Sequence, residues 1–129
     1  MRDRIHSWLS PFALDDALRL HATEVLCRLP APVLSDLMDD PAFSICDYDP
    51  TPGRVAEIPC APPARNRPSR PVALKRTLAR RPADFIRWVI AHELAHAHLR
   101  NAGRWPGEDP ELAADALAEE WGFPRPALR

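Results

Sequence analysis

Cysteine, long apolar runs and an excess of charge of either sign are all scarce in this chain of 129 residues. The three cysteines, Cys27, Cys46 and Cys60, are an odd number, lie far apart and form no Cys-x-x-Cys motif. We therefore expect neither a disulfide framework nor a cysteine-based zinc site. No segment approaches the roughly 18 consecutive apolar residues of a membrane-spanning helix. The charged N-terminus lacks an apolar stretch, so we expect no signal peptide, and the cysteine usage predicts a reducing cytoplasmic location.

Positive and negative charges nearly cancel, because 17 lysines and arginines stand against 18 aspartates and glutamates. This balance argues against nucleic-acid or membrane binding driven by bulk charge. Two blocks depart from it: residues 61–81 hold seven basic and no acidic residues, and residues 108–120 hold six acidic and no basic ones. We interpret both blocks as solvated faces. Hydrophobic residues make up 46% of the chain, and its length suits one domain spanning residues 1–129.

Prolines and capping residues divide the first two thirds of the chain into short elements. Ser10 and Pro11 predict the start of a helix that runs to about Leu29, and a second, short helix is expected over 33–38. Weak alternation over 43–48 and 54–58 predicts a β-hairpin, with 72–74 as a third, edge strand. Together with the helices that follow, these segments predict an α+β fold with a small three-stranded sheet, antiparallel or mixed.

Two more helices are expected towards the C-terminus. The first begins near Pro82 and continues to about Arg100, with apolar residues on nearly all sides, which is typical of a helix in the middle of a domain. Its one expected solvent-facing strip carries Arg87, Ala91 and His98. The last helix follows Asp109 and Pro110, and it should end at Gly122 in a left-handed C-terminal cap, after which Phe123 folds back onto it.

The segment His92-Glu93-Leu94-Ala95-His96 lies in the first of these two helices. Helical positions i and i+4 share one face, so both imidazoles can reach a single metal ion. Glu93 is rotated about 100° from His92, where its carboxylate can contact a water molecule on that ion without binding the ion. The alternative is a buried polar trio held by hydrogen bonds alone, which costs several kcal/mol unless every partner is supplied.

A catalytic zinc site usually has three protein ligands and one open position, so a third ligand is needed. His98 lies about 160° around the helix from His96 and cannot share its ion, and no histidine follows it in the chain. Glu111 and Asp115 lie one turn apart on the last helix, on the side that also carries two small alanines, Ala114 and Ala118.

Glu111 is therefore the predicted third ligand. Asp115 is expected to accept a hydrogen bond from the distal nitrogen of a liganding histidine, and it is the alternative ligand. A purely electrostatic role also stays open for Glu111, because a carboxylate in the first turn complements the helix dipole.

The pattern His92-Glu93-x-x-His96 followed by Glu111-x-x-Ala-Asp115 resembles the gluzincin metallopeptidases, over about residues 85–123. The Glu-x-x-Ala-Asp form is most similar to a branch whose members generally carry transmembrane helices, which this chain lacks. In size and layout the chain is also similar to the small soluble regulatory proteases of the ImmA/IrrE type. The resemblance implies a minimal zincin-like domain in which His92, His96 and Glu111 bind Zn²⁺, Glu93 is the general base and Asp115 supports a ligand.

The function implied is a zinc-dependent metallopeptidase that hydrolyses peptide bonds of a peptide or protein substrate. Zinc lowers the pKa of its bound water to about 7, and Glu93 takes the proton from that water. Tyr48, Arg100 and Arg125 are candidates for stabilising the oxyanion. Two alternatives stay open: a regulatory or binding module that keeps the zincin fold with little or no peptidase activity, and a nucleic-acid-associated protein that uses the basic segment 65–81.

Overall fold

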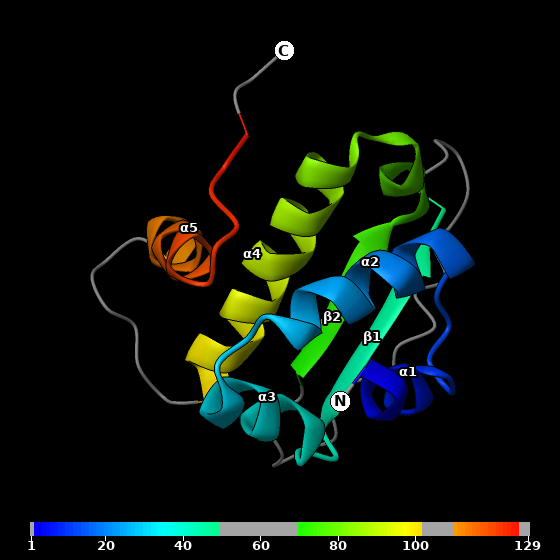
Figure 1. Cartoon of the computed structure of the whole chain (residues 1–129), viewed down its shortest axis with the longest axis horizontal. Helices are drawn as coiled ribbons and strands as arrows, with labels where there is room; N and C mark the ends of the chain where they lie inside the picture. The colour runs from blue at the N-terminus through cyan, green and yellow to red at the C-terminus, as the bar shows by residue number, and fades with distance from the viewer. Residues whose placement is uncertain (1, 50–69, 102–109, 127–129) are drawn as a thin grey trace.

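The computed structural model describes residues 2–49, 70–101 and 110–126. Their elements, in chain order, are α1 (Arg2–Leu9), α2 (Asp16–Cys27), α3 (Ala31–Met38), β1 (Phe43–Tyr48), β2 (Arg70–Lys75), the 3-10 helix η1 (Arg76–Arg80), α4 (Ala83–Asn101) and α5 (Pro110–Glu120). The fold is α+β, as the sequence predicts (Figure 1). Within these three segments, no helix combines the length and apolarity that a bilayer crossing requires.

The two described strands form a parallel pair. Their register runs from Phe43 opposite Arg70 to Tyr48 opposite Lys75. The predicted edge strand 72–74 is therefore present within β2, but it pairs in parallel with β1. The predicted hairpin partner, 54–58, lies outside the described residues. The described part of the sheet has two strands, so a three-stranded sheet is not confirmed.

Helix α1 is an element that the charged N-terminus did not indicate. Ile5 and Leu9 lie one turn apart on it and are both fully buried. Trp8 of the same helix stacks on Phe43 of β1, with 5.2 Å between the ring centroids. Helix α1 therefore owes its place to contacts with a distant part of the chain.

Helix α2 begins later than Ser10 and Pro11 suggest. Asp15 is its N-cap, and the carboxylate of Asp15 accepts a hydrogen bond from the backbone N–H of Ala17 at 3.0 Å. The residues just before it are bound to β1 instead of joining the helix. The backbone N–H of Asp47 donates to the carbonyl of Ala13 at 2.9 Å, and the Asp47 carboxylate accepts from the N–H of Asp15.

Helix α4 runs through the middle of the fold and is covered by α2, α3, β2 and α5 (Figure 1). The strip expected to face solvent is covered too. Ala91 is fully buried, Arg87 donates to His21 of α2 at 3.2 Å, and His98 bonds to Asp36 of α3 at 2.7 Å. The apolar pattern correctly indicated a central helix, but its polar residues mark contacts with neighbouring helices instead of solvent.

Helix α5 packs against α4 and has the C-terminal end that the sequence predicts, while Asp109, which was expected to cap its start, lies outside the described residues (Figure 1). Ala114 and Ala118 are fully buried on it, which allows the close approach to α4. At its C-terminus Gly122 has a φ of +97°. The N–H of Phe123 donates to the carbonyl of Ala118 at 2.9 Å, and the N–H of Gly122 donates to that of Glu119, also at 2.9 Å. This pair of hydrogen bonds is the Schellman motif.

The cysteines differ from the expectation in one respect. Cys46 of β1 is disulfide-bonded, whereas Cys27 is a free thiol. Spacing along the chain does not limit which cysteines pair, because the fold determines which side chains meet. Disulfides persist mainly in oxidising compartments, so the cytoplasmic location stays a prediction that this bond does not favour.

Candidate metal centre

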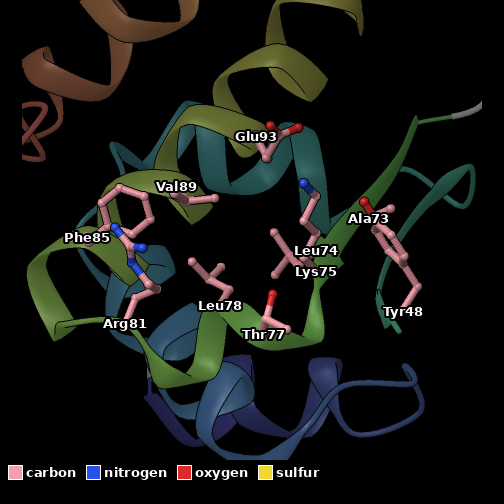
Figure 2. Close-up of a pocket in the computed structure, with 10 residues that line it drawn as sticks. All are labelled: Tyr48, Ala73, Leu74, Lys75, Thr77, Leu78, Arg81, Phe85, Val89 and Glu93. Carbon is pink, nitrogen blue, oxygen red and sulfur yellow. The ribbon is translucent and has the colours of Figure 1, made fainter. Parts of the chain in front are cut away.

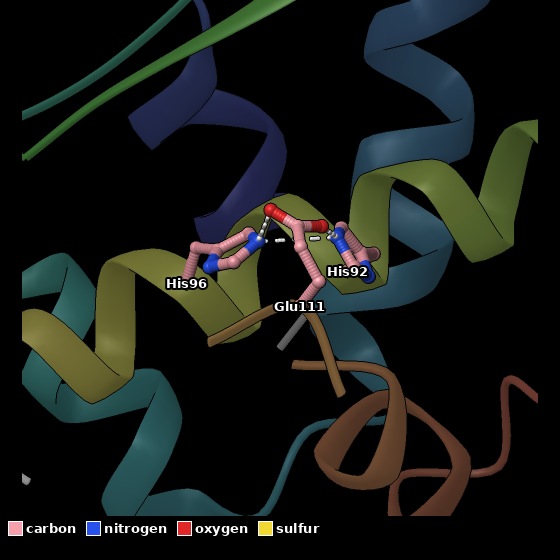
Figure 3. Close-up of side chains that lie close together, drawn as sticks. All are labelled: His92, His96 and Glu111. Carbon is pink, nitrogen blue, oxygen red and sulfur yellow. Dashed lines mark hydrogen bonds and ion pairs between the residues drawn. The ribbon is translucent and has the colours of Figure 1, made fainter. Parts of the chain in front are cut away.

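Helices α4 and α5 bring the three predicted ligands together (Figure 3). His92 and His96 lie one turn apart on α4, and their Nε2 atoms are 3.1 Å from each other. Glu111, in the first turn of α5, spans both rings. Its Oε2 lies 2.8 Å from Nε2 of His92, and its Oε1 lies 3.1 Å from Nε2 of His96. The carboxylate of Glu111 therefore faces both imidazoles.

The spacing of these donor atoms fits a zinc ion. Zinc–nitrogen and zinc–oxygen bonds of about 2.0–2.1 Å in a tetrahedron place neighbouring ligand atoms about 3.3 Å apart. The two nitrogens are 3.1 Å apart, and each lies 2.8 or 3.1 Å from a different oxygen of Glu111. Taken with one donor atom from each residue, the three ligand atoms lie within 4.8 Å of one another, which is close enough for the three side chains to share one ion after they adjust. Two imidazoles and one carboxylate are also a donor set that zinc commonly takes in catalytic sites.

Counting protons shows why hydrogen bonds alone satisfy this cluster poorly. Nδ1 of His92 lies 2.8 Å from Oδ1 of Asp115, which can only accept, so this nitrogen carries a proton. In a neutral ring, Nε2 of His92 then presents a lone pair to the carboxylate of Glu111. Protons on the Nε2 atoms of both His92 and His96 would satisfy Glu111, but they would set two N–H groups against each other across 3.1 Å. One divalent cation satisfies all three groups at once.

Burial and charge differ among the ligands. His92 and His96 are buried, at 8% and 6% exposure, while the Glu111 side chain is 68% exposed, so the cluster lies where the core meets solvent. The pKa of Glu111 is held below its ordinary value, first by hydrogen bonding with His92 and then by hydrogen bonding with His96, against partial desolvation. The contribution of His92 requires a proton on its Nε2 in addition to the one on Nδ1, because a neutral ring bound to Asp115 offers Glu111 a lone pair.

The Nδ1 atoms of the two histidines, which point away from the shared Nε2 contacts, have different surroundings. Nδ1 of His92 is bound by Asp115, the position predicted for a supporting carboxylate. Nδ1 of His96 is buried, and none of the described residues is its hydrogen-bond partner. The alternative in which Asp115 replaces Glu111 as the ligand is not favoured, because Asp115 contacts the distal nitrogen of His92.

Glu93 lies on a different side of α4 from the cluster. Its carboxylate borders a pocket of about 510 Å³ between α4, β2, η1 and the end of β1 (Figure 2). Tyr48, one of the three oxyanion candidates, lines the same pocket. The motif thus divides its side chains, with His92 and His96 turned towards α5 and Glu93 turned towards the pocket.

The other two oxyanion candidates are Arg125 and Arg100. The guanidinium of Arg125 lies over the ring of Trp88, 5.3 Å from its centroid, and the ring of Trp88 lies 5.6 Å from that of His92. The side chain of Arg100 lies outside the described residues. Trp88 lies four residues before His92, on the face of the helix that carries the ligands.

Comparisons of the chain with protein-family models, with curated proteins and with solved structures give no match. The resemblance to gluzincins therefore rests on the motif residues alone.

Proposed function

We propose that this protein is a zinc-dependent metallopeptidase with a minimal zincin-like fold. His92, His96 and Glu111 hold Zn²⁺, Glu93 is the general base, and a peptide or protein is the substrate. The observation that carries the proposal is the convergence of the two Nε2 atoms and the Glu111 carboxylate, with separations of 2.8 to 3.1 Å between them. Glu93, on another side of α4, borders a pocket.

Zinc, when bound there, supplies a Lewis acid and lowers the pKa of a water ligand to about 7. The chain's own residues orient the metal ligands and supply a proton acceptor. Asp115 orients the ring of His92 so that its Nε2 faces Nε2 of His96 and the carboxylate of Glu111. Glu93, one residue further along α4, places its carboxylate at the pocket, where it can accept a proton and later return it to the leaving amine.

The motif favours hydrolysis over other chemistry of the same donor set. A ligand set of two histidines and one carboxylate also occurs in iron enzymes that activate oxygen. In this chain Glu93, an acidic side chain besides Glu111 and Asp115, lies between the two histidines in sequence and faces a pocket. Glu93 provides the base that hydrolysis needs. The regulatory alternative shares the metal cluster with the peptidase, so the cleavage experiment below separates the two. Of the basic segment 65–81, on which the nucleic-acid alternative depends, the structure describes residues 70–81.

The proposal is tested with Glu93→Gln. We expect the zinc-loaded wild type to cleave members of a mixed peptide library, detected by mass spectrometry. Glu93→Gln should keep its zinc and lose about 10²-fold to 10⁴-fold in rate, because only the base is removed. Glu119→Gln, an exposed acidic position on α5, is the control and should retain the wild-type rate. Absence of cleavage by zinc-loaded wild type would contradict the proposal and favour the binding module.

A further inference from the structure

We propose that the pocket beside Glu93 binds an acidic peptide segment, in which a large apolar side chain is followed or preceded by an aspartate or glutamate. The proposal deepens the proposed function by naming its substrate class. Only the cleavage of that segment depends on the zinc chemistry; the binding depends on the pocket itself.

The wall of the pocket is apolar. Leu74 of β2 and Leu78 of η1 are buried at 1% and 7% exposure, and Phe85 and Val89 of α4 complete the wall. In Figure 2 these side chains, from three separate elements, point towards one hollow. A volume of about 510 Å³ lies within the usual range for pockets that enclose a small ligand. It has room for a large apolar side chain together with part of a peptide backbone.

The rim of the pocket is basic. Lys75 and Arg81 are both exposed and line the pocket, and Figure 2 shows their side chains on either side of the hollow. The guanidinium of Arg81 lies over the ring of Phe85, 4.4 Å from its centroid. This stacking holds the charge at the apolar wall and leaves the N–H groups of Arg81 available for a carboxylate.

These two cations are also available. The neighbouring Arg76 is paired with the buried carboxylate of Asp47 at 3.1 Å. Across the described part of the chain, neither Lys75 nor Arg81 forms an ion pair. The one acidic group among the lining residues is Glu93, so the rim carries a net positive charge. A peptide carboxylate beside an apolar side chain complements both features, whereas a basic peptide would be repelled by the rim.

Binding is measured on zinc-loaded Glu93→Gln, so that no peptide is cleaved. Two fluorescein-labelled peptides share one leucine in a neutral sequence and differ only in the next residue, glutamate or glutamine. By fluorescence anisotropy at low salt, we expect the glutamate peptide to bind about twofold to fivefold more tightly. This difference should shrink at high salt, because the rim is exposed.

Adjacent arginines provide a matched control for the charge. Arg81→Glu should abolish the preference for the glutamate peptide. Arg80→Glu makes the same change of charge at an exposed neighbour that does not line the pocket, and it should leave the preference intact. Lys75→Glu is a second test on the opposite rim, should Arg81→Glu fail to fold. Val89→Phe, which fills the hollow, should weaken both peptides about tenfold at an unchanged melting temperature.

The outcomes separate this inference from the proposed function. Equal affinity for the two peptides, or a preference equally reduced by Arg80→Glu and Arg81→Glu, would overturn the inference and leave peptidase activity untouched. Unchanged binding in a folded Val89→Phe variant would also overturn it. Selective binding of the glutamate peptide without cleavage by zinc-loaded wild type would support the pocket assignment and contradict the peptidase.

Discussion

Asp115 of α5 and His92 of α4 are joined by a 2.8 Å hydrogen bond between Oδ1 and Nδ1. This bond links the two helices that carry the candidate ligands, and it fixes which nitrogen of His92 is protonated. The opposite nitrogen of the ring is thereby turned towards Glu111. The same contact therefore orients a ligand and sets its tautomer, two features on which the affinity of a histidine for a metal depends.

Removing this carboxylate should weaken zinc binding. We expect Asp115→Ala to lose about 10-fold to 100-fold in zinc affinity, because His92 loses the partner that orients it. Competition with a chromogenic chelator at pH 7.5 measures the change. Glu119→Ala, one turn further along α5 and exposed, is the control and should bind zinc as the wild type does. Equal affinities for the two variants would show that Asp115 does not support the site.

The contact between His21 and Arg87 predicts a pH dependence of stability. Burial and the positive charge of Arg87 lower the pKa of His21 below its ordinary value of 6.5. The unfolded chain therefore binds more protons than the folded chain as the pH falls below about 6.5, and the free energy of unfolding decreases. Above that pH the contribution of His21 is fully present.

His21→Asn tests this dependence, because asparagine offers Arg87 an acceptor that does not titrate. The melting temperature should fall less in the variant than in the wild type between pH 7.5 and pH 5.5. Equal falls in the two proteins would rule out His21 as a source of the acid sensitivity.

The C-terminal cap of α5 should depend on glycine at position 122. Its φ of +97° is unfavourable for other residues, and a Cβ atom there would have no atom within 4 Å. Gly122→Ala should therefore lower the free energy of unfolding by about 1 kcal/mol through backbone strain alone. Asparagine tolerates left-handed conformations better, so Gly122→Asn should cost less. Urea denaturation measures both, and unchanged stability in Gly122→Ala would contradict the assigned strain.

Local patterns in the sequence predicted the parts of the fold and site that depend on neighbours along the chain. The pairing of His92 with His96 follows from helical spacing, and the end of α5 at Gly122 follows from capping chemistry. The position of Glu111 followed from the one-turn spacing to Asp115 and from the small alanines on the same side. In each case the sequence pattern lies within one helix or on one helical face, even where, as for Glu111, the contact that it serves joins two helices.

Contacts between distant segments could not be predicted in the same way. Alternating residues indicate a strand but not its partner, so the parallel pairing of 43–48 with 70–75 was missed. Helix α1 is short, and the stacking of Trp8 on Phe43 that accompanies its burial involves a residue 35 positions away. The pocket beside Glu93 draws its wall from β2, η1 and α4, and no single segment carries its pattern.

The metal content of the purified protein tests the central claim most directly. After loading with zinc and removal of free metal, elemental analysis should find one zinc per chain in the wild type and almost none in His92→Ala and Glu111→Ala. His98→Ala is the control, because His98 lies on the same helix but bonds to Asp36, and it should retain one zinc. A folded wild type without zinc, or full zinc content in both His92→Ala and Glu111→Ala, would contradict the account.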